Sequence, residues 1–126
     1  MIPNSILENL NTSIILLNTN LCIIYVNPAA EMFFSTSLDR MYNRPEKSIF
    51  YHNGIFNKLS ESIKSGRTFT EREVSIQIQI QEHIVDLNIT PIATNTNQTK
   101  EILLEITPQD RYLKISREER LFSHQQ

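Results

Sequence analysis

The 126-residue sequence is poor in the residues that mark several classes of protein. Its single cysteine cannot form an internal disulfide. Two glycines and five prolines leave little material for disordered linkers, and a chain of this length is most simply one domain. The net charge of -2, with no run of lysine or arginine, offers no broad positive surface to phosphates. We therefore expect one folded module that does not bind nucleic acid.

A long apolar run is also missing. The longest candidate, Ser13 to Val26, is interrupted by Asn18-Thr19-Asn20 and is too short and too polar to span a bilayer. The opening MIPNSILENLN has neither the basic region nor the long apolar region of a secretory signal peptide. By elimination, the expected location is cytoplasmic, without membrane contact.

The first part of the chain predicts a helix and then a β-hairpin. After Pro3, the apolar residues Ile6, Leu7 and Leu10 have the spacing of a short amphipathic helix over residues 3–11. The runs SIILLN and LCIIYV are typical of strands, and the asparagines between them tolerate the geometry of a turn.

Helices dominate the middle of the sequence. Asn27-Pro28 predicts the end of the second strand and the start of a helix in PAAEMFFS. Residues 36–53 predict irregular turns and one-turn helices. A further helix is expected in IFNKLSESIK, with Gly66 as its C-cap. Its predicted apolar face consists of Ile55, Phe56, Leu59 and Ile63.

Three strands are expected after this helix. In FTEREVSIQIQI, the residues Val74, Ile76, Ile78 and Ile80 alternate with polar ones. Gln81-Glu82 is expected to form a turn, and HIVDLNITPI continues the alternation. The polar loop TNTNQTKE leads to ILLEIT, which Pro108 ends. The order predicts an α+β fold, with short helices on one face of a five-stranded antiparallel sheet.

This order of elements, with IIYVNPAAEMFF after a hairpin, resembles the PAS domain. SIILLNTNLCIIYVNPAAEMFF and the closing LLEITPQDRYLKISREERLFSHQQ are similar to the cytoplasmic nitrogen-regulation sensor histidine kinases of the NtrB type. The resemblance implies a PAS sensor domain over residues 1–110 and the start of a signalling helix over residues 111–126. Leu21 stands where many PAS domains have a turn glycine.

The resemblance also implies a regulatory function. The H-E-x-x-N-P motif of the phosphorylated histidine does not occur in these residues, so this fragment is not expected to be an enzyme. Its parent is expected to be a histidine kinase that transfers phosphate to a response regulator and receives nitrogen status through the PII signal protein, both outside this fragment. The alternative is a PAS sensor of another signalling protein that binds haem or flavin.

Two groups of residues are candidates for signalling. Asp110 and Arg111 stand between the last strand and the exit helix, where an aspartate caps the helix and can couple the sheet to it. Homodimerisation is expected, because apolar residues fall on one face of each terminal helix. These dimer-interface candidates are Ile6, Leu7, Leu10, Ile115 and Phe122.

Other reactive side chains predict no catalytic, cofactor or metal site. His52 occupies the region of the haem ligand in some PAS relatives, yet a lone histidine near a loop is more often structural. Cys22 lacks the N-C-R-F-L context of flavin-reactive PAS cysteines, and His83 is expected to be exposed. Glu71 and Glu73 are expected to share a solvated strand face.

Overall fold

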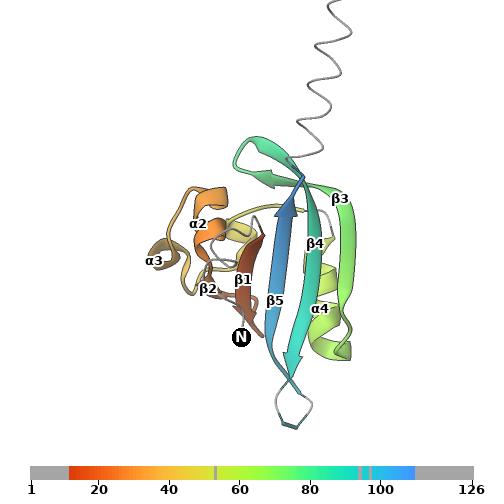
Figure 1. Ribbon diagram of the computed structural model, residues 1–126. Coiled ribbons are helices and arrows are strands. Elements are labelled where there is room, and N and C mark those ends of the chain that lie inside the picture. The colour runs from red at the N-terminus through yellow and green to blue at the C-terminus, as the bar shows by residue number, and fades with distance from the viewer. Residues whose placement is uncertain (1–11, 53, 94, 97, 110–126) are drawn as a thin grey trace, which may run out of the picture.

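The structure is a computed structural model that describes residues 12–52, 54–93, 95–96 and 98–109 (Figure 1). The helices expected over residues 3–11 and 111–126 lie outside these residues. The described elements, in chain order, are β1 (Ser13–Asn18), β2 (Ile23–Val26), α2 (Pro28–Phe34), α3 (Leu38–Met41), the 3-10 helix η1 (Glu46–Ser48), α4 (Ile55–Ser65), β3 (Phe69–Ile78), β4 (Gln81–Ala93) and β5 (Thr99–Pro108).

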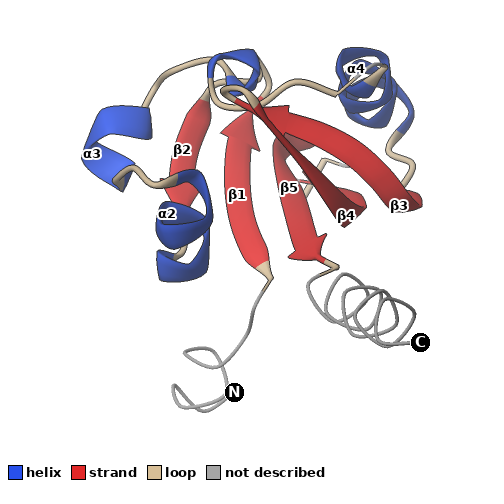
Figure 2. Cartoon of the chain, turned by 90° about the horizontal axis from the view of Figure 1, so that it is seen from above, coloured by secondary structure: helices blue, strands red, loops and turns tan. Residues whose placement is uncertain are grey.

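The strands form one antiparallel sheet in the order β2-β1-β5-β4-β3, which confirms the predicted fold class. The first and last strands are therefore neighbours at its centre. Figure 2 shows α2 and α3 beside β2, while α4 lies near β3 and β4. No helix of the described residues is long and apolar enough to cross a membrane.

Alternate residues of the strands form the core. In β1 every second residue is fully buried. In β5 the residues Ile102, Leu104 and Ile106 are fully buried, and the neighbouring strand β4 shows the same alternation. This period of two is the one that the sequence predicted for a sheet with one dry face. Fully buried core side chains include Ile15, Leu17, Ile23, Leu59, Ile76, Val85, Ile102, Leu104 and Ile106.

The main helix, α4, lies where the sequence predicted it, but its buried face differs from the predicted one. Gly66 ends it with a φ of 71° and an N–H bond to the Ser62 carbonyl, the expected C-cap. Its buried face runs through Ile55, Leu59 and Ser62, with spacing i, i+4 and i+7. The prediction for Phe56 was wrong, because its side chain lies off this face and is 60% exposed.

The turn between β3 and β4 comes two residues earlier than predicted. Ile78 pairs with Gln81, so Gln79 and Ile80 form the turn. Gln79 has a φ of 57°, the left-handed conformation that a two-residue hairpin turn requires. Ile80 continues the apolar alternation of the sequence, but in the structure it lies in the turn. Its side chain is 97% exposed, not buried as the pattern predicted.

A β-bulge interrupts β3. Glu71 pairs with Leu87 and Val74 with Val85, so one residue of β4 faces two of β3. Glu73 has a φ of 54° at this point, and its N–H donates to the Asp86 side chain over 2.9 Å. The expectation that Glu71 and Glu73 share a face was wrong, because the extra residue breaks the alternation.

The turn between β1 and β2 includes a residue that the sequence assigned to the second strand. Leu21 has a φ of 61°, and its N–H bonds to the Asn18 carbonyl, so β2 begins only at Ile23. The Asn18 side chain accepts the N–H groups of Asn20 and Cys22. Leu21 thus adopts a glycine-like backbone, and its side chain is nevertheless buried.

Candidate functional site

The described residues hold no group of three or more histidine, cysteine, aspartate or glutamate side chains that could hold a metal ion. The remaining candidates for function are the ends of the central strands, the isolated buried polar groups and the surface hollows.

The chain enters and leaves the sheet through neighbouring strands. Ser13 at the start of β1 pairs with Ile106 near the end of β5. The hydroxyl groups of Thr12 and Thr107 lie 3.2 Å apart, within hydrogen-bond distance. Because the two strands are antiparallel, the residues that precede β1 and those that follow β5 attach to the same end of the sheet.

Asn27 ties this end of β1 to the first helix. Its Oδ1 accepts the N–H of Ala30 over 2.9 Å, which caps α2, and also accepts the N–H of Ile14 over 3.0 Å. Its Nδ2 donates to the carbonyl of Thr12 over 3.1 Å. Sequence reasoning predicted the helix start after Asn27 but missed the link to β1, because nothing in the sequence shows that residues 12 and 27 are neighbours.

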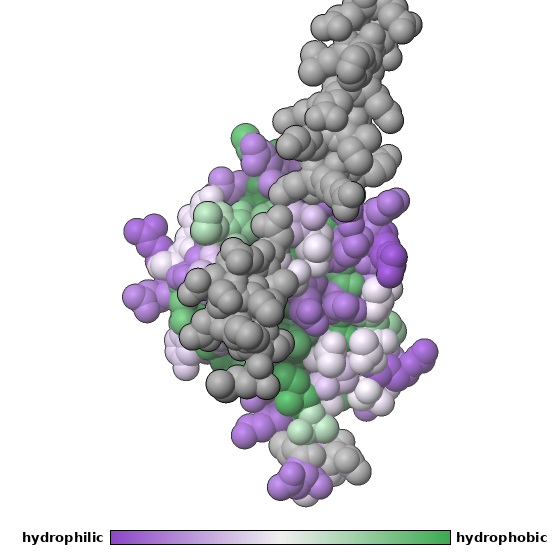
Figure 3. Space-filling model, viewed as in Figure 1, coloured by the Kyte–Doolittle hydropathy of each residue, from purple (hydrophilic) through white to green (hydrophobic). Residues whose placement is uncertain are grey.

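Apolar side chains also lie on the sheet face opposite the core. Leu16 pairs with Tyr25 on one side and with Leu103 on the other. Tyr25 is 45% exposed, and the two leucines are half-buried. Figure 3 shows hydrophobic and hydrophilic side chains mixed over the visible part of the molecule. This row is a candidate interaction surface.

His52 lies in a polar cluster between α4 and β3. Its Nε2 is 3.3 Å from an oxygen of Glu71, whose other oxygen forms an ion pair with Lys58. Burial, and next the Lys58 ammonium, holds the pKa of His52 below its ordinary value. This environment therefore favours the neutral imidazole. Glu71 is half-buried in this cluster, so the expectation of a solvated glutamate there was wrong.

This environment does not suit His52 for haem ligation. An axial ligand needs an imidazole nitrogen directed at an open space for the iron, whereas Nε2 faces a carboxylate paired with an ammonium group. Cys22 forms an isolated backbone bridge with Pro45 and is half-buried.

Glu46 is a buried carboxyl group that sequence reasoning missed. It opens η1, its N–H donates to the Leu21 carbonyl over 3.0 Å, and its residue is only 2% exposed. Its Oε2 is buried without a hydrogen-bond partner. Burial raises the pKa of Glu46, against a smaller lowering by Lys47. Glutamates usually lie at the surface, so composition gave no signal for it.

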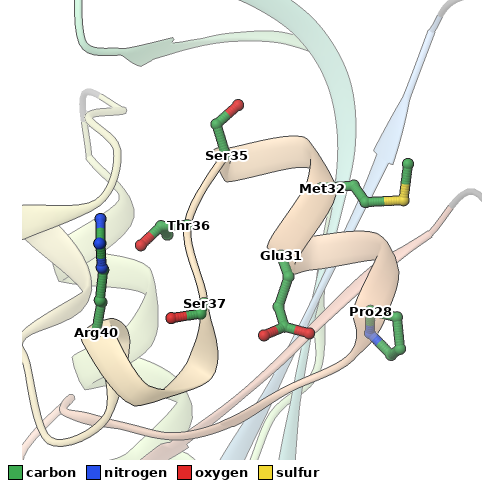
Figure 4. A pocket seen from close by; sticks show the side chains of 7 residues that line it. All are labelled: Pro28, Glu31, Met32, Ser35, Thr36, Ser37 and Arg40. Carbon is green, nitrogen blue, oxygen red and sulfur yellow. The ribbon is translucent and has the colours of Figure 1, made fainter.

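An open depression of about 590 Å³ lies between α2 and α3. Figure 4 shows Glu31 and Arg40 on opposite sides of it, with Ser37 between them. An oxygen of Glu31 accepts the N–H of Leu38 over 2.9 Å, which fixes the loop between the helices. This carboxylate is thus explained by the local structure without a ligand.

A second hollow, of about 350 Å³, lies between α2 and the tip of the β3–β4 hairpin. His83 lines it and packs edge-on against the Phe33 ring, with the two ring centres 5.1 Å apart. His83 was expected to be exposed, but it is half-buried because the hairpin brings it onto α2. This contact joins two elements far apart in sequence.

The predicted signalling residues lie outside the described part of the chain. Asp110 and Arg111 follow immediately after Gln109, the last described residue, whose N–H donates to the Ile84 carbonyl over 3.0 Å. The five predicted dimer-interface residues also lie outside it. Their roles remain predictions from the sequence.

Comparison with known families gives the same fold. The family described as the PAS fold matches residues 3–108. The chain belongs to the PAS family. This PAS domain is 30% identical over 115 residues to the sensory histidine kinase/phosphatase NtrB of Proteus hauseri, covering 90% of the chain and 32% of that protein. NtrB of Vibrio alginolyticus is 26% identical over 126 residues, covering 99% of the chain and 35% of that protein.

Solved structures agree with the assignment. The PAS domain of nitrogen regulation protein NR(II) from Vibrio parahaemolyticus superposes with a TM-score of 0.68 at 23% identity, covering 86% of this chain and 98% of that one. A PAS domain from Colwellia psychrerythraea gives a TM-score of 0.70 at 13% identity, covering 83% and 92%. The resemblance to NtrB-type PAS domains is confirmed. The PAS domain spans about a third of the length of the curated relatives that it matches.

Proposed function

We propose that this PAS domain is the regulatory sensor module of a cytoplasmic nitrogen-regulation histidine kinase of the NtrB type. It would hold two chains together and pass a signal to a kinase core through the residues that follow β5. The observation that carries this proposal is the pairing of β1 with β5, which brings the entry and exit of the domain together at Thr12 and Thr107. Because backbone pairing joins the two strand ends, a displacement of one end would also displace the other.

Asn27 supplies the second link in this relay. Its side chain binds the backbone of β1 and the first turn of α2, so a movement of the helix would reach Thr12 directly. Asp110 and Arg111 would then carry the movement from the sheet into the exit segment. Such a relay requires that an effector bind two states of the domain with different affinity.

Dimerisation is proposed to use the apolar row on the outer sheet face together with the N-terminal segment. Leu16, Tyr25 and Leu103 provide an apolar strip in register. In the helix predicted over residues 3–11, Ile6, Leu7 and Leu10 would provide a matching apolar face. Ile115 and Phe122, seven residues apart, would continue the contact beyond the domain.

The parent protein would carry out the chemistry outside these residues. By the similarity to NtrB, it would phosphorylate itself on a histidine, transfer the phosphate to a response regulator and respond to the PII signal protein. The PAS domain itself is proposed to bind none of these substrates. Its contribution is to set the relative position of two kinase cores.

The dimer proposal is tested with Leu10→Asp. A charge on the apolar face of the predicted helix should shift the sedimentation coefficient of the purified domain from dimer to monomer, because a buried unpaired carboxylate is costly. Tyr42→Asp is the matched control, since Tyr42 is 59% exposed after α3 and should leave the dimer intact. A domain that stays dimeric with Asp at position 10 would contradict the proposal.

A further inference from the structure

The polar cluster around His52 joins the start of α4 to β3. His52 precedes α4, Lys58 belongs to α4 and Glu71 belongs to β3. The His52 side chain is only 9% exposed, while those of Glu71 and Lys58 are 22% and 35% exposed. These are the ionisable groups that the two packed elements place against the imidazole. A change of charge on one of the three therefore affects the other two.

The cluster leaves part of its hydrogen-bonding capacity unused. Nε2 of His52 lies 3.3 Å from Oε2 of Glu71, and Lys58 pairs with the other oxygen of this carboxylate. Among the described residues, neither Oε2 of Glu71 nor Nδ1 of His52 has a hydrogen-bond partner. A neutral imidazole carries one N–H, whereas an imidazolium carries two. The cluster can thus accept one further N–H at Glu71 but offers no acceptor at Nδ1.

Protonation of His52 would change the balance within the cluster. The imidazolium can donate a charge-assisted hydrogen bond to Oε2 of Glu71, and it then competes with Lys58 for the same carboxylate. Its positive charge also repels the Lys58 ammonium. The N–H at Nδ1 would be buried without an acceptor, which is costly until water can reach it. The observed arrangement therefore suits the neutral imidazole and opposes the charged one.

The backbone on the two sides of His52 is held with different strength. On one side, Tyr51 and Gln77 of β3 exchange two backbone hydrogen bonds, both of 2.8 Å. On the other side, the His52 carbonyl accepts the N–H of Ile55, the first residue of α4, over 3.3 Å, beyond the usual range for such a bond. The start of α4 is therefore the part that gives way more easily when charge builds up in the cluster.

We propose that His52 is a pH-sensitive switch, in which uptake of a proton by the imidazole weakens the Lys58–Glu71 contact and loosens the start of α4 from β3. The inference goes beyond the proposed function, because this response requires neither an effector nor a second chain. Burial, and next the Lys58 ammonium, lowers the pKa of His52. The loosened state therefore binds the proton more tightly, and it is favoured as pH falls below about 6.5, the pKa of an unperturbed histidine.

Amide hydrogen exchange of the 126-residue chain tests the loosening of α4. His52→Gln removes the titrating group. At about pH 5.5, on the acid side of an ordinary histidine pKa, the α4 amides should exchange several-fold faster in the wild type than in His52→Gln. At about pH 7.5 the two rates should agree, since the wild-type imidazole is then neutral. Equal α4 rates in the two proteins at the lower pH would overturn the proposal.

Titration of the His52 imidazole by NMR tests the two partners separately. Lys58→Gln should raise the proton affinity of His52 by about tenfold, because it removes the repelling charge, and Glu71→Gln should lower it. Lys64→Gln is the matched control, since it makes the same change at an exposed position of the same helix and should leave the affinity unchanged. Equal shifts in Lys58→Gln and Lys64→Gln would contradict the assigned contacts. None of these results bears on the dimer, which Leu10→Asp tests.

Discussion

At the scale of single residues, two polar side chains differ in how their hydrogen-bonding groups are satisfied. Asn27 is half-buried, makes three hydrogen bonds and joins two elements, so its polar atoms are compensated. Glu46 has a carboxyl oxygen with no partner, so its burial penalises the ionised form. The polar atoms of Asn27 are thus hydrogen-bonded, whereas one carboxyl oxygen of Glu46 is buried without a partner.

Glu46 gives a prediction with a definite sign. Because burial raises the pKa of Glu46 in the folded state, folding binds its proton more tightly, and stability falls as pH rises from the unfolded pKa, about 4.3, through the folded one. Glu46→Gln cannot ionise. It should raise the free energy of unfolding at pH 8 by about 1 kcal/mol relative to pH 4, measured by urea denaturation at both pH values.

The control for this substitution is Glu61→Gln, on the exposed side of α4. It should change the unfolding free energy little and equally at both pH values. If Glu46→Gln gave the same change at pH 4 and pH 8, the carboxyl group would not be the source of the pH dependence.

At the scale of elements, the sheet departs from a regular ladder at the bulge in β3. Glu73 adopts a left-handed backbone that costs a non-glycine residue about 1–2 kcal/mol. Its N–H bond to Asp86 holds the bulge in place. The apolar residues of FTEREV, Phe69 and Val74, are five positions apart and yet both pack against the core, so the break in alternation reflects the extra residue of the bulge.

Glycine substitution distinguishes the bulge from the rest of β3. Glu73→Gly should raise the free energy of unfolding by roughly 0.5 kcal/mol, since relief of the left-handed strain exceeds the entropy that glycine loses on folding. Gln77→Gly, in the same strand but with ordinary extended backbone that pairs with Tyr51, should lower it. Thermal denaturation of both variants checks the two signs, and a loss at position 73 would show that the bulge is not strained.

At the scale of the whole molecule, neighbouring leucines of β5 serve the two faces of the sheet. Leu104 is fully buried in the core, while Leu103 lies half-buried on the outer face proposed for dimerisation. A substitution on the core face should affect folding, and a substitution on the outer face should affect association. Two adjacent residues in sequence therefore belong to different functions.

Leu104→Ala and Leu103→Ala test this division. Leu104→Ala should lower the free energy of unfolding by about 2–5 kcal/mol, because it leaves a cavity in the core. Leu103→Ala should cost much less stability and should instead weaken the dimer. Chemical denaturation and sedimentation of both variants give the comparison, and similar losses of stability would argue against the division.

How much of the structure the sequence predicted depended on how far apart along the chain the interacting residues lie. Hydrophobic periodicity predicted the five strands, and Asn27-Pro28 and Gly66 predicted helix ends, because these signals act over a few residues. The turn at Gln79 and Ile80, by contrast, depends on the register of two strands. The exposure of Phe56 follows from how α4 lies on the sheet.

The sequence by itself determined the fold class and most of the core, because alternation and local turn chemistry act over a few residues, and its resemblance to PAS domains indicated the family. Only the tertiary structure decided which polar groups meet: Asn27 with Thr12 and Ile14, His52 with Glu71, and His83 with Phe33. The physical reason is that these contacts depend on the packing of distant elements, where a shift of one residue in register moves a side chain to the other face.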